Sequence, residues 1–194
     1  MKQTRSIVIL SCVMLLFLLS LSFSPTYAGG FGKAIAVGET VPQFSLHAPK
    51  SVKEQKYLGL QNTNPFSLSQ LPAKLVLVEI FSTTCGSCKK SAPGMNKLFK
   101  FIQNDKKLSN DLRMLAIGQG DSAIKVGAWR KKYRVKFPLF PDQKRIVFRK
   151  FGTPGTPYTI LINNSSGEVL YAHGGEIKDI GEFLTELKKF QKKL

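Results

Sequence analysis

The sequence predicts an α/β fold in which helices flank both faces of a central mixed β-sheet. Residues 75–81 form a near-continuous apolar run, which is typical of a strand buried on both faces. Residues 95–102 repeat apolar side chains at helical spacing. The turn-rich stretch 163–167 separates two β-type runs and is typical of a hairpin. Because helical and strand patterns alternate along the chain, we expect the helices to pack on the sheet.

The N-terminal segment has the pattern of an export signal. Lys2 and Arg5 precede a long apolar stretch, and the segment ends at Ala28, a small residue of the kind that a signal peptidase accepts. We therefore expect residues 1–28 to be a signal peptide. An uncleaved membrane anchor is the alternative, because the apolar stretch is just long enough to cross a thin bilayer. Residues 29–194 then form one domain.

Two short elements are expected before the central strand. Residues 41–46 predict an edge strand, because Pro42 cannot donate a hydrogen bond to a central ladder. Residues 57–60 are expected to form a second strand inside the polar stretch 50–64, the part of the chain with the weakest secondary-structure pattern.

The elements after the central strand have clearer patterns of apolar spacing, capping residues and turns. They are a helix over residues 85–105 with a kink at Pro93, a strand over 113–118, a helix over about 122–133 that Asp121 or Ser122 can cap, a short extended piece over 137–140, a brief helix over 141–151, strands over 158–162 and 168–172, and a last helix from about residue 180.

The chain is strongly basic. Lys and Arg number 29 and Asp and Glu number 12, which gives a formal net charge of +17, or +15 once Lys2 and Arg5 leave with the signal. Such a surface favours acidic proteins, anionic lipid head groups or nucleic acid. Export argues against nucleic acid as a partner. The basic residues are also scattered along the chain, as expected of solvated helix faces.

The cysteines predict redox chemistry. Cys12 lies in the expected signal, so the domain contains only Cys85 and Cys88, in a C-x-x-C that follows the apolar strand and begins a helix. A bridge across so short a loop removes little chain entropy, so we expect it to open and close during function. Cys85 lies at the helix N-terminus, where the dipole favours a thiolate. Cys88, one turn further on, can resolve a mixed disulfide.

Metal binding is the main alternative for such a pair. A structural zinc site needs four ligands, and outside the expected signal the chain offers only these two cysteines together with His47 and His173. We therefore expect no metal and no cofactor. A copper carrier would need Cys85, Cys88 and a histidine to converge. Nothing in the sequence brings either histidine to the cysteines.

Several separated residues resemble one family. Glu79 precedes Cys85 by six residues, Pro93 follows it by eight, and residues 155–159 begin the late hairpin with a Gly-Thr-Pro. In these features the chain resembles exported thioredoxin-like thiol-disulfide oxidoreductases of the TlpA/ResA type, related to the AhpC/TSA redoxins. The resemblance runs from residue 37 to the C-terminus, with extra residues around 50–64.

The resemblance implies a thioredoxin-like fold and a role for each residue. Cys85 would be the attacking thiol, Cys88 the resolving thiol, and the two would form the redox-active disulfide. Pro157 would be a cis-proline facing the dithiol, with Thr156 offering its backbone to a substrate; an ordinary trans turn proline is the alternative. Glu79 would be a buried carboxyl that exchanges a proton with Cys88. Its alternative is a strand-edge acid paired with a lysine.

The implied function is a thiol-disulfide oxidoreductase in the periplasm or another extracytoplasmic space, reducing exported proteins such as apocytochromes with electrons from a membrane or periplasmic donor. Thr84 replaces a tryptophan common in the family, and the Gly86-Ser87 spacer contains no proline. These neighbours influence the reduction potential, so the direction of electron flow stays open. The alternatives are a noncatalytic module that binds an acidic protein or copper, and a peroxiredoxin-like peroxidase, for which Ser82 stands where a threonine is expected.

Overall fold

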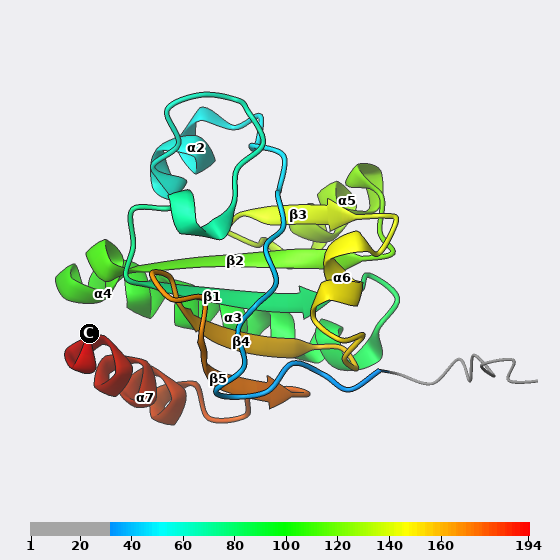
Figure 1. Ribbon diagram of the computed structural model, residues 1–194. Helices are drawn as coiled ribbons and strands as arrows, with labels where there is room; N and C mark the ends of the chain where they lie inside the picture. The colour runs from blue at the N-terminus through cyan, green and yellow to red at the C-terminus, as the bar shows by residue number, and fades with distance from the viewer. Residues whose placement is uncertain (1–31) are drawn as a thin grey trace, which may run out of the picture. The chain divides into compact units, whose positions relative to one another are not determined.

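The computed structural model describes residues 32–194, so the expected signal at residues 1–28 lies outside the described part. A five-stranded sheet has the order β3-β2-β1-β4-β5 (Figure 1). The parallel strands are β1 (Leu75–Phe81), β2 (Leu112–Gln119) and β3 (Leu139–Asp142). The strands β4 (Tyr158–Asn163) and β5 (Val169–Gly174) form an antiparallel hairpin beside β1. The predicted mixed sheet is therefore confirmed.

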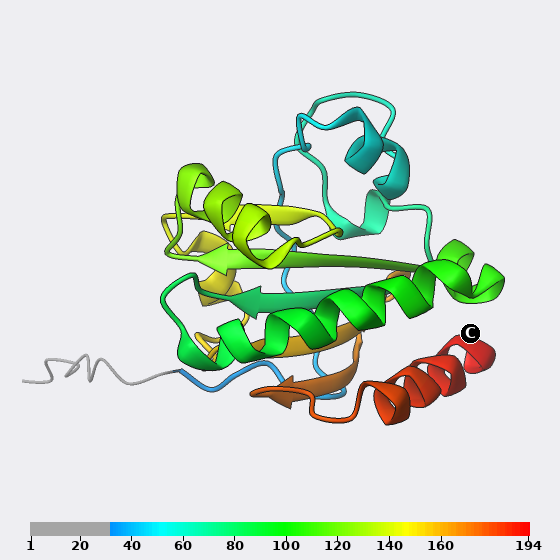
Figure 2. The same cartoon turned by 180° about the vertical axis from the view of Figure 1, so that it is seen from behind.

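Helices cover both faces of this sheet. The structure contains α2 (Val52–Leu58), a 3-10 turn η1 (Leu68–Gln70), α3 (Gly86–Asn104), α4 (Lys106–Asp111), α5 (Ala123–Tyr133), α6 (Ile146–Lys150) and α7 (Ile180–Lys193). Figure 2 shows α3, α5 and α7 on one face, whereas α6 and the N-terminal segment cover the other face in Figure 1. Within residues 32–194 no helix combines the length and apolar character that crossing a membrane requires.

The central strand β1 explains why the domain needs both layers. All seven of its side chains are buried. Leu75, Leu77 and Phe81 pack toward α3, α5 and α7, and the alternate residues Val76, Val78 and Ile80 pack toward the opposite layer. Full burial of such a side chain contributes about 1.5–3 kcal/mol to the stability of the fold. If only one layer of helices were present, the side chains on the other face of this strand would be exposed and would lose that contribution.

The two strands expected before β1 are absent from the structure. Residues 41–46 form no regular strand; only Thr40 and Leu46 make isolated bridges, to Glu168 and Phe66. The alternation that suggested a strand is real, because Phe44 and Leu46 are buried. However, this segment crosses the face of the sheet instead of extending its edge (Figure 1).

Residues 57–60 lie at the end of helix α2 instead of in a strand. Ser51 caps the helix by accepting a hydrogen bond from the Glu54 N–H, and Gly59 ends it with a left-handed φ of 71°. These two caps outweigh the short β-like run at Tyr57 and Leu58. The prediction missed them because the surrounding stretch is polar and short.

The boundary between β3 and α6 also differs from the prediction. The brief helix was expected from residue 141, but β3 continues through Asp142 and α6 begins at Ile146. The Asp142 carboxylate accepts hydrogen bonds from the N–H groups of Ile146 and Phe148, both at 2.8 Å. Asp142 therefore ends the strand and satisfies the start of the helix.

Tyr57 fastens α2 to the sheet. Its hydroxyl accepts a hydrogen bond from the Met114 N–H at 2.8 Å and lies 3.4 Å from the Met114 carbonyl oxygen. β3 pairs with β2 only from Ala116 onward. The Tyr57 hydroxyl therefore supplies hydrogen bonds to the part of the β2 edge that β3 does not reach. The ring also meets Phe99 of α3 edge-on, with centroids 5.5 Å apart.

Candidate active site

The two cysteines form a disulfide at the start of α3. Cys85 is the N-cap residue, and its Sγ accepts a hydrogen bond from the Cys88 N–H, with an N···S distance of 3.0 Å. The Cα atoms are 5.3 Å apart, which is usual for a disulfide. Cys85 is partly exposed, whereas Cys88 is only 1% exposed. An incoming thiolate or disulfide can therefore reach Cys85 and not Cys88.

A buried carboxylate holds the loop that leads into Cys85. Asp121, 2% exposed, accepts one hydrogen bond from the Thr83 N–H at 2.7 Å and another from the Thr83 hydroxyl at 2.6 Å. Asp121 is predicted from the sequence only as a possible helix cap, but Ser122 caps α5 instead. The position of Asp121 just beyond β2 could have indicated this role. Because β1 and β2 are parallel, they end at the same edge of the sheet, so Asp121 lies near the loop that follows β1.

The Thr156–Pro157 peptide lies against the dithiol and is cis. The Thr156 carbonyl oxygen is 3.2 Å from Cys85 Sγ, although the two residues are 71 positions apart. The Pro157 carbonyl oxygen accepts a hydrogen bond from the Gly175 N–H at 2.8 Å, which ties this turn to the end of β5. The alternative of an ordinary trans proline is therefore wrong.

Glu79 is a buried acid in the centre of the sheet. It is 6% exposed and lies between Ala116 of β2 and Thr159 of β4. Burial raises its pKa to about 7, against the opposing effect of a hydrogen bond that the Ser91 hydroxyl donates to Oε1 at 3.3 Å. None of the three ion pairs within residues 32–194 includes Glu79, so the alternative of a lysine-paired acid is wrong.

Ser91 connects this acid to the helix that carries the cysteines. It follows Cys88 by three residues, so the two lie on neighbouring turns of one helix face, and both are buried. Sequence reasoning missed Ser91. Its signal would have been a polar residue on the apolar face of an amphipathic helix, at the level of the only acid in β1.

The histidines are not gathered around the cysteines. Over residues 32–194 no three side chains of the His, Cys, Asp and Glu types come together as a metal site would require. The His173 ring stacks on Tyr171 with a centroid distance of 6.2 Å.

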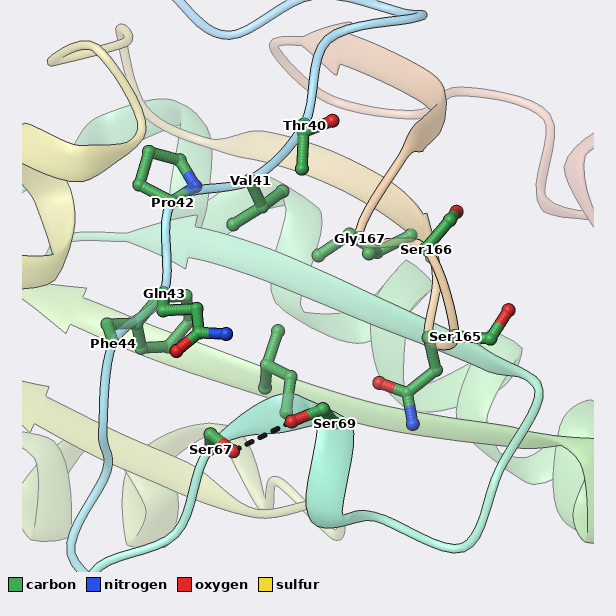
Figure 3. A pocket seen from close by; sticks show the side chains of 13 residues that line it. Thr40, Val41, Pro42, Gln43, Phe44, Ser67, Ser69, Ser165, Ser166 and Gly167 are labelled. Atoms are coloured by element: carbon green, nitrogen blue, oxygen red, sulfur yellow. Dashed lines mark hydrogen bonds between the residues drawn. The ribbon is translucent and has the colours of Figure 1, made fainter.

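A small pocket of about 160 Å³ lies at the other end of the sheet (Figure 3). Residues 40–44, η1 and the turn between β4 and β5 line it, and Ser67 and Ser69 share a hydroxyl contact of 2.9 Å at its side. Asn163, next to this turn, pairs with Leu75 at the start of β1, whereas Cys85 follows the end of β1. None of the predicted site residues lines this pocket.

Comparisons with known proteins agree with this geometry. The Redoxin family profile matches residues 36–187. The chain is 29% identical to the thiol-disulfide oxidoreductase ResA of Bacillus subtilis (strain 168) over 164 residues, which cover 84% of this chain and 82% of that protein.

Two solved structures share the fold. The thioredoxin domain of a thiol-disulfide oxidoreductase from Bacteroides vulgatus has a TM-score of 0.59 at 16% identity, over 81% of this chain and 99% of that one. AhpC from Mycobacterium tuberculosis has a TM-score of 0.57 at 16% identity, again over 81% and 99%. These likenesses confirm the predicted thioredoxin-like fold.

Proposed function

This chain belongs to the Redoxin family, and on that premise we propose that it is a thiol-disulfide oxidoreductase that reduces exported proteins through the Cys85–Cys88 pair. The observation that carries this proposal is the disulfide at a helix N-terminus, with Cys85 partly exposed beside the Thr156–Pro157 turn and Cys88 buried. The ResA relative, which is named a thiol-disulfide oxidoreductase, supports the same chemistry.

The reaction starts from the reduced pair. The Cys85 thiolate attacks one sulfur of a substrate disulfide, a Cys85–substrate bond forms, and the other substrate sulfur leaves as a thiolate. Cys88 then loses its proton and attacks Cys85 Sγ. This closes the Cys85–Cys88 disulfide and releases the second substrate thiolate, which takes up a proton from water. Two electrons pass from the dithiol to the substrate, and a donor dithiol must later return them.

Glu79 is the proposed proton acceptor for Cys88. A carboxyl with a pKa of about 7 is present in both protonation states near neutral pH, so it can take the Cys88 proton and give it back. Its place on β1, bonded to Ser91 one turn beyond Cys88, supports this role. The carboxyl touches no other acid or base in an ion pair within the described residues.

Thr156 is the proposed docking point for the substrate backbone. Its carbonyl oxygen lies next to Cys85 Sγ, where an extended substrate segment could pair with it while its own sulfur meets Cys85. Substrates that contact backbone alone need no particular sequence, which suits a general reductant.

We also propose that the protein works outside the cytoplasm, in the periplasm or an equivalent compartment. The pattern of residues 1–28 supports export, either with cleavage or as a retained anchor. The partners would then be exported proteins with disulfides and a membrane or periplasmic electron donor. Nucleic acid is not proposed as a partner.

Trapping tests the exchange mechanism. With Cys88→Ser, the mixed disulfide at Cys85 cannot be resolved, so substrate proteins should accumulate as adducts that dithiothreitol releases. Cys85→Ser is the matched control and should give none. If the Cys88→Ser protein forms no adduct in an oxidising periplasmic extract, the exchange mechanism is wrong.

The reduction potential tests the direction. A value near about −270 mV, as in thioredoxin, would support a reductant, whereas one near about −120 mV, as in DsbA, would indicate an oxidant. Equilibration of the wild-type protein with glutathione buffers measures it.

A further inference from the structure

A second site lies on the same helix as the dithiol but far from it. A groove of about 830 Å³ opens between α2, the second half of α3 and the segment that leads into β3. We propose that it binds a small amphipathic anion, with an aliphatic or aromatic body and one carboxylate, sulfonate or phosphate group. The groove volume falls in the range of about 300–1,000 Å³ that small-ligand sites occupy.

The floor of the groove is apolar and aromatic. Tyr57 and Phe99 meet edge-on at 5.5 Å, and Val135 and Pro138 continue the surface. The Tyr57 hydroxyl is already bonded to Met114, so the ring is what this residue offers to a ligand. Burial raises the pKa of Tyr57 to about 12, which keeps the ring neutral. Such a floor favours an apolar body over a polar one.

The rim of the groove is cationic. Lys53, Lys56, Lys100 and Lys136 surround it, and all four are exposed. No ion pair within residues 32–194 includes any of them. Lysine stems can lie along an apolar wall while the ammonium groups remain at the surface. A ligand head group at the mouth therefore meets positive charge, so the groove selects an anion.

The one acid at the rim does not cancel this charge. Glu54 Oε1 lies 2.7 Å from Arg130 Nη2, and this pair joins α2 to α5 across the groove. Arg130 Nη1 also donates to the Phe137 carbonyl oxygen at 3.2 Å. With this acid and Arg130 paired to each other, the four lysines remain to meet a ligand.

The groove walls are held in place by contacts across long sequence separations. Tyr57 bonds to β2 through Met114, and Asn96 of α3 donates to the Tyr133 carbonyl oxygen of α5 at 2.8 Å. Both ends of α2 are capped. A groove whose walls are fixed before binding loses little free energy to ordering when a ligand enters.

This site is separate from the proposed exchange reaction. Phe99 follows Cys85 by 14 positions along the chain, which is about 20 Å along a helix. No residue of the dithiol site lines the groove. The inference therefore does not depend on the proposed function.

Calorimetry on the full chain tests the ligand class. Dodecanoate should bind the native protein saturably with one site. Acetate, which lacks the apolar body, and dodecyltrimethylammonium, which reverses the charge, should each bind at least tenfold more weakly. An aromatic sulfonate, anilinonaphthalene sulfonate, should be displaced by dodecanoate. No saturable binding of dodecanoate, or equal binding of the cationic amphiphile, would overturn the proposal.

A matched pair of variants tests the location. Lys100→Glu with Lys136→Glu should weaken dodecanoate binding at least tenfold, and insulin reduction should stay unchanged. Lys74→Glu with Lys178→Glu makes the same change in net charge at exposed positions outside the groove and should alter binding less than twofold. If both pairs weaken binding equally, the attraction is non-specific and the site is wrong. Lys100→Ala and Lys136→Ala repeat the test should the reversed pair fail to fold.

Discussion

The two ends of helix α3 are built from different kinds of contact. At its start, buried polar groups hold the segments on either side of the dithiol: Asp121 bonds to the preceding loop and Glu79 bonds to Ser91. In its second half, aromatic rings dominate, and Phe99 packs on Tyr57 and on Phe137. The first end thus carries the polar groups of the proposed thiol exchange, and the second end carries an aromatic cluster. Substitutions at the first end should therefore change the reaction rate, whereas those in the second half should change stability alone.

The two ends of α3 also differ in how their contacts affect the stability of the fold. A buried carboxyl with a pKa near 7 lowers stability at neutral pH, because its ionised form is poorly solvated. Packed rings such as Tyr57 and Phe99 have no such pH-dependent cost. Glu79 in the central strand therefore lowers stability at neutral pH at the position of the proposed proton acceptor.

The largest effect is expected for Glu79→Gln. Loss of the proposed base should slow resolution of the mixed disulfide by about 100-fold, the low end for a general base. The wild-type rate should rise with pH through about 7, and the variant should lose this inflection. Stopped-flow measurement of resolution across pH tests both points. A variant that keeps the inflection would assign it to another group.

The same substitution tests stability with a definite sign. The folded pKa of Glu79 is raised from 4.5 to about 7, so the folded state binds the proton more tightly than the unfolded state. Its contribution to stability is full below about pH 4.5 and is lost as pH rises through 7, by about 3 kcal/mol in all. Urea unfolding should show this loss in the wild type, and Glu79→Gln should remove it.

Asp121→Ala should have the next largest effect, and it should act on rate and stability together. It removes two hydrogen bonds to Thr83, which contribute about 1 kcal/mol each, so the free energy of unfolding should fall by about 2 kcal/mol. The loosened loop should also slow insulin reduction by about tenfold. Thr83→Val removes only the hydroxyl bond and should have a smaller effect on both. An Asp121→Ala protein with unchanged rate would show that the loop needs no such support.

Tyr57→Phe should affect stability alone. It leaves the Met114 N–H and carbonyl without their partner where β3 does not cover β2, which should cost about 1–2 kcal/mol. The ring contact with Phe99 remains, and the dithiol is distant, so insulin reduction below the melting temperature should not change. Urea unfolding and the reductase assay measure the two quantities. A reduced rate would mean that the two ends of α3 are coupled.

The same contrast explains what could be predicted from sequence. The central strand, the dithiol helix and the late hairpin have short-range patterns of burial, capping and turn residues, so their predictions agree with the structure. The family resemblance then supplied Glu79 and the Thr156–Pro157 pair. Thr156 meets Cys85 through topology that the fold class already implies, and Glu79 bonds to Ser91 of the helix that carries the cysteines.

The missed features depend on distant partners. Tyr57 bonds to a backbone group 57 residues later, and Thr83 to an acid 38 residues later. No local pattern reveals such pairs, so residues 57–60 at the end of α2 were predicted as a strand and Asp121 only as a possible cap. Ser91 was missed because a single polar residue hardly alters an amphipathic helix pattern.

The smallest effect is expected for Ser91→Ala, and it separates a positioning residue from a purely structural one. The Ser91 hydroxyl stabilises the ionised form of Glu79, so its loss should raise the pKa of Glu79 further. The inflection in the resolution rate should move to higher pH, and the rate at neutral pH should fall about threefold because less carboxylate is present. Ser91→Thr keeps a hydroxyl and should restore the wild-type inflection. A Ser91→Ala protein with lower stability and an unmoved inflection would show that Ser91 only fills space beneath Cys88.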